Sequence, residues 1–373
     1  MKITSLSLTN FRCFQQLNLT FNSPITLIVG DNGSGKTSIL EALHYGCYLR
    51  SFRTKTSTQL IKFEDETFCI KLAGITDQEQ WNLTAGISSA KRRVTINDKA
   101  VTSYKPILDR YRVITITEDD LDLVRGYPVA RRAFLDTILF MMDSSHGNMV
   151  RDYEKIIRQR NSLLEKTPYI DRVTYDAWTD RCKELSSIIQ AKRQALLIDL
   201  EREANLLLEA DQNSSPKMVV CEYKAKVWHD KSFEREQAAQ RTLYGAHLDD
   251  IEILYSDHYS RHFASRGQQK MLVIVFKMAA LKLLQKPVLI LVDDFMTDLD
   301  RHKIEQLLTI LTKGEHQLII TCPIAQSPLD HALQSYRAQI ISLQETIKPA
   351  SNLKEIHEEA ITLTPHHRDE LQL

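Results

Sequence analysis

The residues best suited to chemistry form one continuous loop near the start of the chain. Gly30 to Thr37 reads G-D-N-G-S-G-K-T and matches the phosphate-binding pattern G-x-x-x-x-G-K-[ST] at every fixed position. The candidate nucleotide ligands are Gly30, Asp31, Asn32, Gly33, Ser34, Gly35, Lys36 and Thr37. We expect the loop N–H groups to bind phosphate oxygens, Lys36 to act catalytically on the β- and γ-phosphates, and Thr37 to bind Mg²⁺.

The segments beside the loop are those that a phosphate site requires. Residues 25–29 are continuously apolar or β-branched and predict a buried strand, and residues 38–49 predict a helix. A helix that starts at the loop directs the positive end of its dipole at an anion. An accidental glycine turn would not need a strand before it and a helix after it, so the sequence favours a nucleotide site.

A second carboxylate site follows far downstream. The apolar run Val288–Val292 leads directly into Asp293 and Asp294, which is typical of a buried parallel strand whose carboxyl end reaches the ligand crevice. We expect Asp293 to hold Mg²⁺ and Asp294 to polarise the attacking water. A solvated acidic turn is the alternative for this segment alone.

A third motif lies before an apolar helical run, Lys270–Leu284. The segment Ser265–Gln269 offers another anion site, with Ser265, Gly267 and Gln268 as candidate ligands. In ABC-type ATPases the corresponding serine caps the γ-phosphate bound by the neighbouring subunit, and Thr297–Asp300 resembles their D-loop. A simple serine cap and a simple turn are the alternatives for the two segments.

The chain is similar, up to about Leu343, to the RecF family of the SMC-like branch of ABC ATPases. The matching segments are Leu8–Arg12, Ser51–Thr54, Glu118–Val124, Arg131–Asp136, Gln159–Asn161, Gly245–Asp250 and Ser265–Gln269. The chain departs from the family pattern at Glu118, where a proline is usual, and at Ala246 and Leu248, where proline and arginine are usual.

The resemblance implies a function. It implies a weak, DNA-stimulated ATPase that forms an ATP-dependent homodimer on duplex or junction DNA and hydrolyses ATP slowly for release. It would help RecO and RecR load a recombinase at single-strand gaps. Arg12 would reach the phosphates or form a surface salt bridge. Many ABC enzymes have a histidine where Thr321-Cys322-Pro323 stands here, and slow turnover would fit its loss.

The composition is that of an ordinary globular protein. The 48 Lys and Arg balance 48 Asp and Glu, so any DNA contact must come from local patches. The candidate patches are Arg50 with Arg53 and Lys55, Lys91–Arg93, Arg131 with Arg132, and Arg151 with Lys155, Arg158 and Arg160. A solvated helix face is the alternative for each.

The six cysteines lack metal-binding spacing, and the longest apolar stretch is too short for a bilayer, so we expect a cytoplasmic protein without membrane partners.

The motifs divide the chain. Because 235 positions separate Gly30 from Ser265, a compact insertion must lie between the halves of the site. We expect an α/β fold, an ABC-type P-loop core of mixed sheet and flanking helices with an inserted mostly helical lobe broken at Thr167-Pro168. The expected parts are the first half of the core, with antiparallel strands (1–125), the helical lobe (126–215), the second half of the core (216–343) and a polar tail (344–373). We expect Val219–Glu222 to be the strand with which the chain re-enters the core.

Two other classes of protein stay open at this point. A transporter ATPase subunit would need a surface that couples to membrane partners, and the long insertion and the missing histidine speak against it. An SMC-type structural DNA clamp would need sustained heptad arms, for which the insertion is short.

Overall fold

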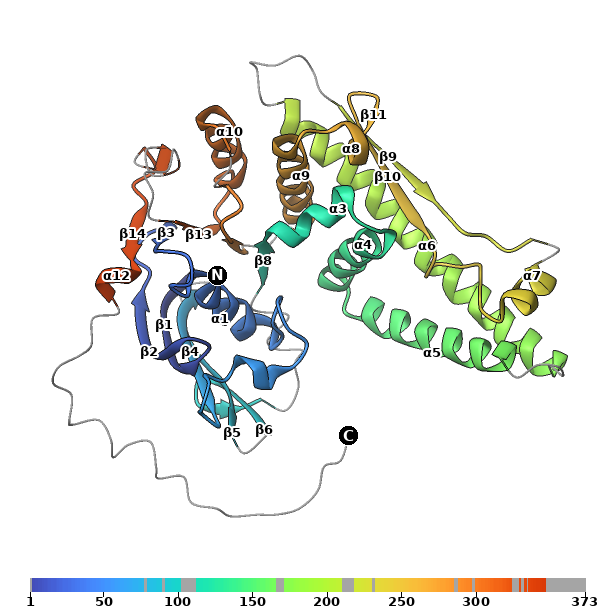
Figure 1. Ribbon diagram of the computed structural model, residues 1–373, viewed down its shortest axis with the longest axis horizontal. Coiled ribbons are helices and arrows are strands. Elements are labelled where there is room, and N and C mark those ends of the chain that lie inside the picture. The colour runs from blue at the N-terminus through green and yellow to red at the C-terminus, as the bar shows by residue number, and fades with distance from the viewer. Residues whose placement is uncertain are drawn as a thin grey trace.

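The protein combines a two-sheet core with a helical lobe, as seen in a computed structural model (Figure 1). The structure describes residues 2–76, 79–88, 91–101, 112–165, 171–209, 218–229, 232–284, 288–296, 299–323, 329, 332–333 and 335–346. In Figure 1 the two sheets of the core lie on the left, and the long helices extend to the right together with a third, smaller sheet.

A parallel sheet of five strands carries the segments that the motifs predict. Its order is β14-β3-β13-β12-β8, with β14 Gln339–Ser342, β3 Ile25–Val29, β13 Gln317–Cys322, β12 Leu289–Val292 and β8 Val113–Ile116. The strand before the phosphate loop and the strand before the two acids are therefore confirmed. Because β13 alone separates them, their carboxyl ends lie at one edge.

The expected antiparallel strands form a second sheet. Its order is β2-β1-β4-β5-β6-β7, with β1 Lys2–Phe11, β2 Phe14–Thr20, β4 Phe68–Thr76, β5 Glu79–Ser88, β6 Lys91–Ile96 and β7 Lys99–Ala100. Helix α1 (Lys36–Tyr48) packs with this sheet and one face of the parallel sheet in a single core. Leu289 and Leu291 of β12 face that core, whereas Ile290 and Val292 face the core containing α9 (Arg266–Leu284) and α10 (Arg301–Leu311). Because successive side chains of a strand point to opposite faces of the sheet, β12 contributes side chains to both cores.

The lobe contains three long helices, α4 (Pro128–Met142), α5 (Ser145–Glu165) and α6 (Arg172–Glu209). The helical pattern is confirmed, but Thr167-Pro168 lies outside the described residues. An additional break occurs at Asp143, whose carboxylate accepts hydrogen bonds from the backbone N–H (2.9 Å) and the hydroxyl (2.6 Å) of Ser145. Side chains of this kind compete with helical hydrogen bonds, which explains the break.

One strand lies in a different sheet from the one expected. Val219–Glu222 belongs to β9 (Val219–Lys224), which pairs with β10 (Asp250–Tyr255) in a three-stranded sheet completed by β11 (His258–Tyr259). Val219 packs with Leu200 and Ala204 of α6 in a shared core, so this strand does not rejoin the nucleotide-binding sheet. Its pairing depends on β10, which the local pattern does not show. The division of the chain into domains stays a prediction.

Short elements complete the described structure. They are η1 (Ser57–Leu60), η2 (Glu118–Leu121), α3 (Asp122–Arg125), α7 (Ser232–Ala239), α8 (Ser260–Phe263) and α12 (Leu343–Thr346). Of the expected tail, only Gln344–Thr346 is described. Within the described ranges, no helix combines the length and the hydropathy needed to cross a membrane.

Candidate nucleotide-binding site

The phosphate loop has a backbone that only glycine adopts readily at two positions. Gly33 has φ 85° and Gly35 has φ 97°, both in the left-handed region. A Cβ at Gly35 would also collide with the side chains of Phe14 and Cys13, whereas a Cβ at Gly33 would meet open space. Helix α1 begins directly after the loop, with the Ile39 N–H donating to the Gly35 carbonyl at 3.1 Å. The N–H groups of its first turn are thus available to an anion.

The loop and the acidic strand meet. The hydroxyl of Thr37 donates to Oδ1 of Asp293 at 2.9 Å, across 256 positions of sequence. Lys36 is 4% exposed and its Nζ donates to the carbonyl oxygens of Gly30 (2.9 Å) and Asp31 (3.3 Å), with Asp294 Oδ2 at 3.6 Å. The four residues proposed to act on phosphate and metal therefore lie together.

Thr37 and Asp293 suit a magnesium ion. They supply one hydroxyl and one carboxylate oxygen in hydrogen-bond contact, and Mg²⁺ in phosphate sites commonly takes one or two protein oxygens and completes its shell with phosphate and water. Burial raises the pKa of Asp293, although the hydrogen bonds from Thr37 and Thr321 lower it. A buried carboxylate of this kind gains from a nearby cation.

Thr321 is a site residue that the motif analysis did not assign. It lies at the end of β13, is 1% exposed, and contacts both acids: its hydroxyl donates to Asp293 Oδ1 (3.0 Å) and accepts from the Asp294 N–H (2.8 Å). The available signal was its position at the end of an apolar parallel strand. Sequence reasoning treated this position only as lacking a histidine.

Arg12 lies beside the loop helix and is held by a buried carboxylate. Its Nε and Nη2 donate to the two carboxylate oxygens of Glu41 at 2.8 and 2.7 Å, and its Nη1 donates to the Gln59 carbonyl at 2.8 Å. Glu41 is fully buried in α1, and Ser51 also donates to it. The structure thus shows a salt bridge for Arg12, and contact with phosphate stays a prediction. Glu41 and Gln344, which donates to Asp31 Oδ2 at 2.7 Å, were not anticipated.

The second predicted anion site lies at the start of α9, and no hydrogen bond joins it to the phosphate loop among the residues described. Ser265 is exposed; its Oγ accepts from the Gln268 N–H (3.3 Å), and its N–H donates to the Gln268 side chain (2.8 Å). Gly267 lies against Lys303, since a Cβ there would be 3.1 Å from Lys303 Cδ. In the D-loop segment, Thr297 and Asp298 lie outside the described residues.

Three arginines of the candidate DNA-binding clusters, Arg131, Arg132 and Arg160, make contacts inside the protein instead. Arg131 is 4% exposed and donates to Asp250 at 2.7 Å, and Arg132 donates to the Asp249 carbonyl at 2.7 Å. Arg160 is fully buried and pairs with the fully buried Glu236 at 2.7 Å. Buried arginines cannot contact a DNA backbone without unpairing these carboxylates, so the predictions for Arg131 and Arg160 were wrong.

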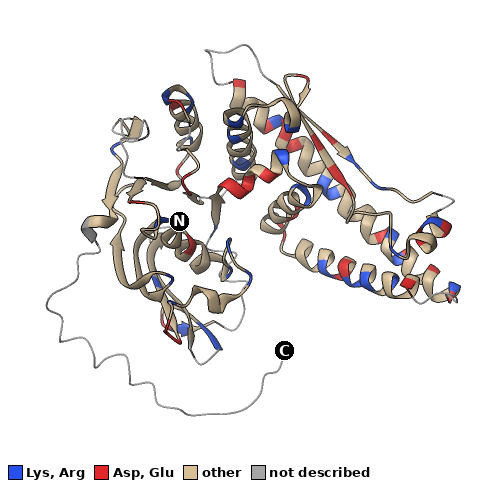
Figure 2. Ribbon diagram, in the orientation of Figure 1, with Lys and Arg blue, Asp and Glu red and all other residues tan. Residues whose placement is uncertain are grey.

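Two other basic clusters lie on neighbouring segments. Arg50, Arg53 and Lys55 follow α1, and Lys91–Arg93 lie on β6; all are exposed. Arg92 donates to Ser57 Oγ at 3.0 Å, which joins the two segments. Figure 2 shows Lys and Arg residues on β6. We call these six residues the basic surface.

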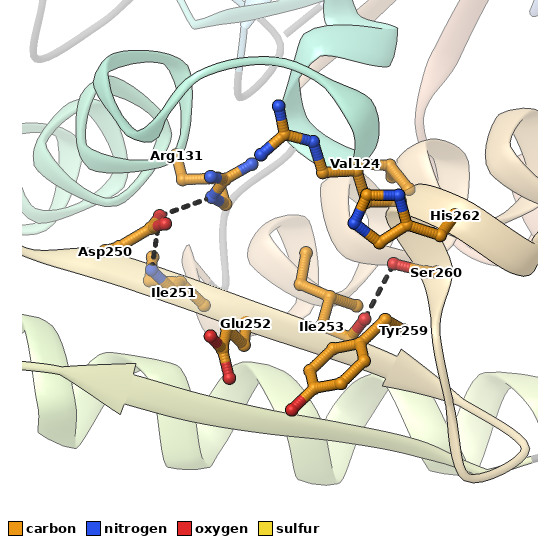
Figure 3. Close-up of a pocket in the computed structure, with 10 residues that line it drawn as sticks. Val124, Arg131, Asp250, Ile251, Glu252, Ile253, Tyr259, Ser260 and His262 are labelled. Carbon is orange, nitrogen blue, oxygen red and sulfur yellow. Dashed lines mark hydrogen bonds and ion pairs between the residues drawn. The ribbon is translucent and has the colours of Figure 1, made fainter.

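A separate cavity of about 210 Å³ lies between α3, α4 and β10 (Figure 3). Arg131 and its partner Asp250 lie at one end, and Tyr259 and His262 at the other. Because Arg131 donates to both Asp250 and the Gly126 carbonyl (3.0 Å), its charge is already satisfied there. The loop residues and the two acids do not line this cavity.

Comparison with known proteins agrees with this geometry. The family model for the RecF/RecN/SMC N terminal domain matches residues 2–340. A phosphate loop, an acidic parallel strand and a helical insertion thus define an SMC-like member of the ABC-type P-loop class, and the predicted α/β fold is confirmed. The chain belongs to the RecF family.

Individual relatives support this assignment. The DNA replication and repair protein RecF of Natranaerobius thermophilus is 30% identical over 356 residues, covering 86% of this chain and 91% of the relative. The RecF protein of Synechococcus sp. strain JA-2-3B'a(2-13) is 29% identical over 351 residues, with the same two coverages of 86% and 91%.

Solved structures share the fold. The recombination mediator protein RecF with ATP, from the RecFOR pathway, superposes with a TM-score of 0.74 at 22% identity, covering 87% of this chain and 92% of that one. The Smc head domain from Pyrococcus furiosus gives 0.53 at 13% identity, covering 89% and 91%.

Proposed function

We propose that this chain is an ATP-dependent DNA-binding ATPase of recombinational repair and replication restart. The observation that carries the proposal is the 2.9 Å contact between Thr37 and Asp293, with Lys36 and Asp294 beside it. The names of the relatives, which describe DNA replication and repair, and the solved RecF complex with ATP support the same function.

Each residue of the site then has a role. Lys36 binds the β- and γ-phosphates, exchanging the Gly30 and Asp31 carbonyls for phosphate oxygens. Thr37 and Asp293 hold Mg²⁺, which supplies charge neutralisation at the phosphates. Asp294 orients the attacking water. Arg12, fixed by Glu41, stands near the loop as an additional cation.

The active site is shared between two subunits. Ser265, Gly267 and Gln268 lie at an exposed helix N-terminus, where a partner's γ-phosphate can accept hydrogen bonds from backbone N–H groups. ATP bound by the loop of one chain is thus capped by Ser265 of the other, and ATP closes a homodimer.

DNA binds through its phosphate backbone to the basic surface, because phosphate contacts need only exposed cations and no base-reading geometry. Slow hydrolysis then opens the dimer and releases DNA. The solved relative belongs to the RecFOR pathway, which supports RecO- and RecR-type proteins as partners in recombinase loading at single-strand gaps.

Gel filtration with and without ATP and Mg²⁺ tests the proposal. We expect a monomer without nucleotide, a dimer with ATP and Mg²⁺, and tighter retention of DNA by the dimer. A chain that binds ATP but stays monomeric at every concentration would contradict the shared site.

A further inference from the structure

Thr321 joins the two acidic residues of the site through a single hydroxyl group. The group is nearly inaccessible to solvent, at 1% residue exposure. Its proton is directed to Asp293 Oδ1 at 3.0 Å, closer than the Val292 carbonyl at 3.4 Å, and its lone pair accepts the Asp294 N–H at 2.8 Å. One side chain therefore orients a carboxylate and a backbone simultaneously.

The backbone of Asp294 makes a tight turn. Its φ is 45°, in the left-handed region, which costs a residue with a Cβ up to roughly 1–2 kcal/mol and costs Asp less than most. The hydrogen bond from the Asp294 N–H to Thr321 fixes the peptide that precedes this turn. The turn directs the Asp294 carboxylate toward Lys36, 3.6 Å from its Nζ. Without the hydroxyl, the carboxylate would lose this placement.

We infer that Thr321 is a positioning residue that holds Asp293 for the metal and Asp294 for the attacking water. The inference rests on the proposed function. Thr37, on α1, donates to the same oxygen of Asp293 at 2.9 Å. A metal bound by Thr37 and Asp293 would replace the hydrogen bond between these two residues. Thr321, on β13, would still orient the carboxylate of Asp293.

Two substitutions at this position test the inference. Thr321→Val keeps the shape and removes the hydroxyl, and Thr321→Ser keeps the hydroxyl. We expect Thr321→Val to lower kcat about tenfold or more, the range expected for a lost buried hydrogen bond to a charged group. It should also reduce the gain in ATP affinity that Mg²⁺ gives, measured by calorimetry with Mg²⁺ and with EDTA. Metal-free ATP affinity should stay unchanged, and Thr321→Ser should restore both quantities.

Thr26 provides a matched control. It is fully buried on the neighbouring strand β3, and its hydroxyl has no hydrogen-bond partner among the described residues. Thr26→Val should therefore leave kcat and the Mg²⁺ effect unchanged. Thermal unfolding of all variants shows whether each is folded.

The outcomes separate this inference from the proposed function. Normal kcat and a normal Mg²⁺ effect in Thr321→Val would overturn the role of Thr321 alone. Equal losses in Thr321→Val and Thr321→Ser, or an equal loss of metal-free ATP binding, would also overturn it, because either result indicates general structural damage. A wild-type chain that does not bind ATP would instead refute the proposed function.

Discussion

The ammonium group of Lys36 lies 3.6 Å from the carboxylate of Asp294 while donating to two carbonyl oxygens of its own loop. The lysine is thus already positioned in a buried site, with its charge partly balanced by the acid that we assign to water. Binding of a triphosphate must exchange these contacts for phosphate oxygens, so both residues are direct targets for substitution.

Lys36→Met should weaken ATP binding strongly enough to abolish ATP-dependent dimerisation while preserving the fold. Loss of a charge-assisted hydrogen bond, worth about 1.5–3 kcal/mol, corresponds to roughly 10- to 150-fold weaker affinity. Calorimetry and gel filtration measure the two effects. Lys71→Met, at an exposed position of β4, is the matched control and should behave as wild type. Unchanged ATP affinity in Lys36→Met would refute the site.

Asp294→Asn should separate binding from hydrolysis. The amide keeps the size of the side chain but no longer polarises water, so ATP should bind while turnover falls by about a hundredfold or more, as for loss of a general base. The ATP-bound dimer should therefore remain on DNA longer than wild type, which surface plasmon resonance can measure. Normal hydrolysis by this variant would assign water activation to another residue.

Ser265→Arg tests the shared active site. Because Ser265 is exposed, arginine should not disturb the core, but it would fill the space for the partner's γ-phosphate. The variant should bind ATP as a monomer and fail to dimerise. Ser265→Ala removes the hydroxyl, and with it a helix cap worth about 1 kcal/mol, but adds no bulk, so it should weaken dimerisation less than Ser265→Arg.

Mixing Ser265→Arg with Lys36→Met should restore part of the ATPase activity. Each heterodimer can form one composite site. It combines the intact loop of the Ser265→Arg chain with the intact Ser265 of the Lys36→Met chain. Neither parent should hydrolyse ATP alone. Full activity of Ser265→Arg by itself, independent of protein concentration, would show that the site closes within one chain.

Charge reversal on the basic surface should weaken DNA binding without affecting ATP binding. Lys91→Glu with Arg93→Glu removes two exposed cations of β6, so affinity should fall and the salt dependence of log K should become shallower by about two. Fluorescence anisotropy over a salt series provides the measurement. Lys183→Glu, at an exposed position of α6 outside the candidate patches, should change neither quantity. An unaltered salt slope in the β6 variant would place DNA elsewhere.

Acid should destabilise the protein through two half-buried histidines, His44 and His247. Burial and the nearby charge of Lys277 lower the pKa of His44 from 6.5 to about 3, and burial lowers that of His247 to about 4. Unfolding therefore takes up protons below pH 6.5: stability is complete above this pH and decreases as the pH falls toward the folded-state values. Each histidine should account for about 2 kcal/mol between pH 7 and pH 5.

Replacing one histidine should remove half of this dependence. His44→Asn can still bond to Thr115, which His44 contacts at 2.8 Å, but does not titrate. Urea unfolding of this variant at several pH values should give about half the wild-type loss of stability. His258→Asn, at an exposed position, should leave the loss unchanged. A full loss in His44→Asn would show that His44 is not the source.

The sequence by itself determined the elements whose geometry is local. The loop Gly30–Thr37 follows from its glycines and from the strand and helix that touch it in sequence, and β3 has the predicted bounds. The alternating strands of the antiparallel sheet and the helices of the lobe follow from periodicity, because burial of one face repeats every two or 3.6 residues. The pairing of Lys36 and Thr37 with Asp293 and Asp294 also followed, since carboxyl ends of parallel strands share one edge.

Only the tertiary structure decided which distant groups neutralise each other. Arg131 and Arg160 look like surface cations in sequence, but both side chains are buried and pair with Asp250 and Glu236. Val219–Glu222 has the pattern of a strand, yet its partner β10 determines the sheet to which it belongs. Thr321 becomes a site residue because β13 lies between the loop strand and the acidic strand. Contacts of this kind depend on partners tens to hundreds of residues away, and periodicity reports a buried face without identifying what covers it.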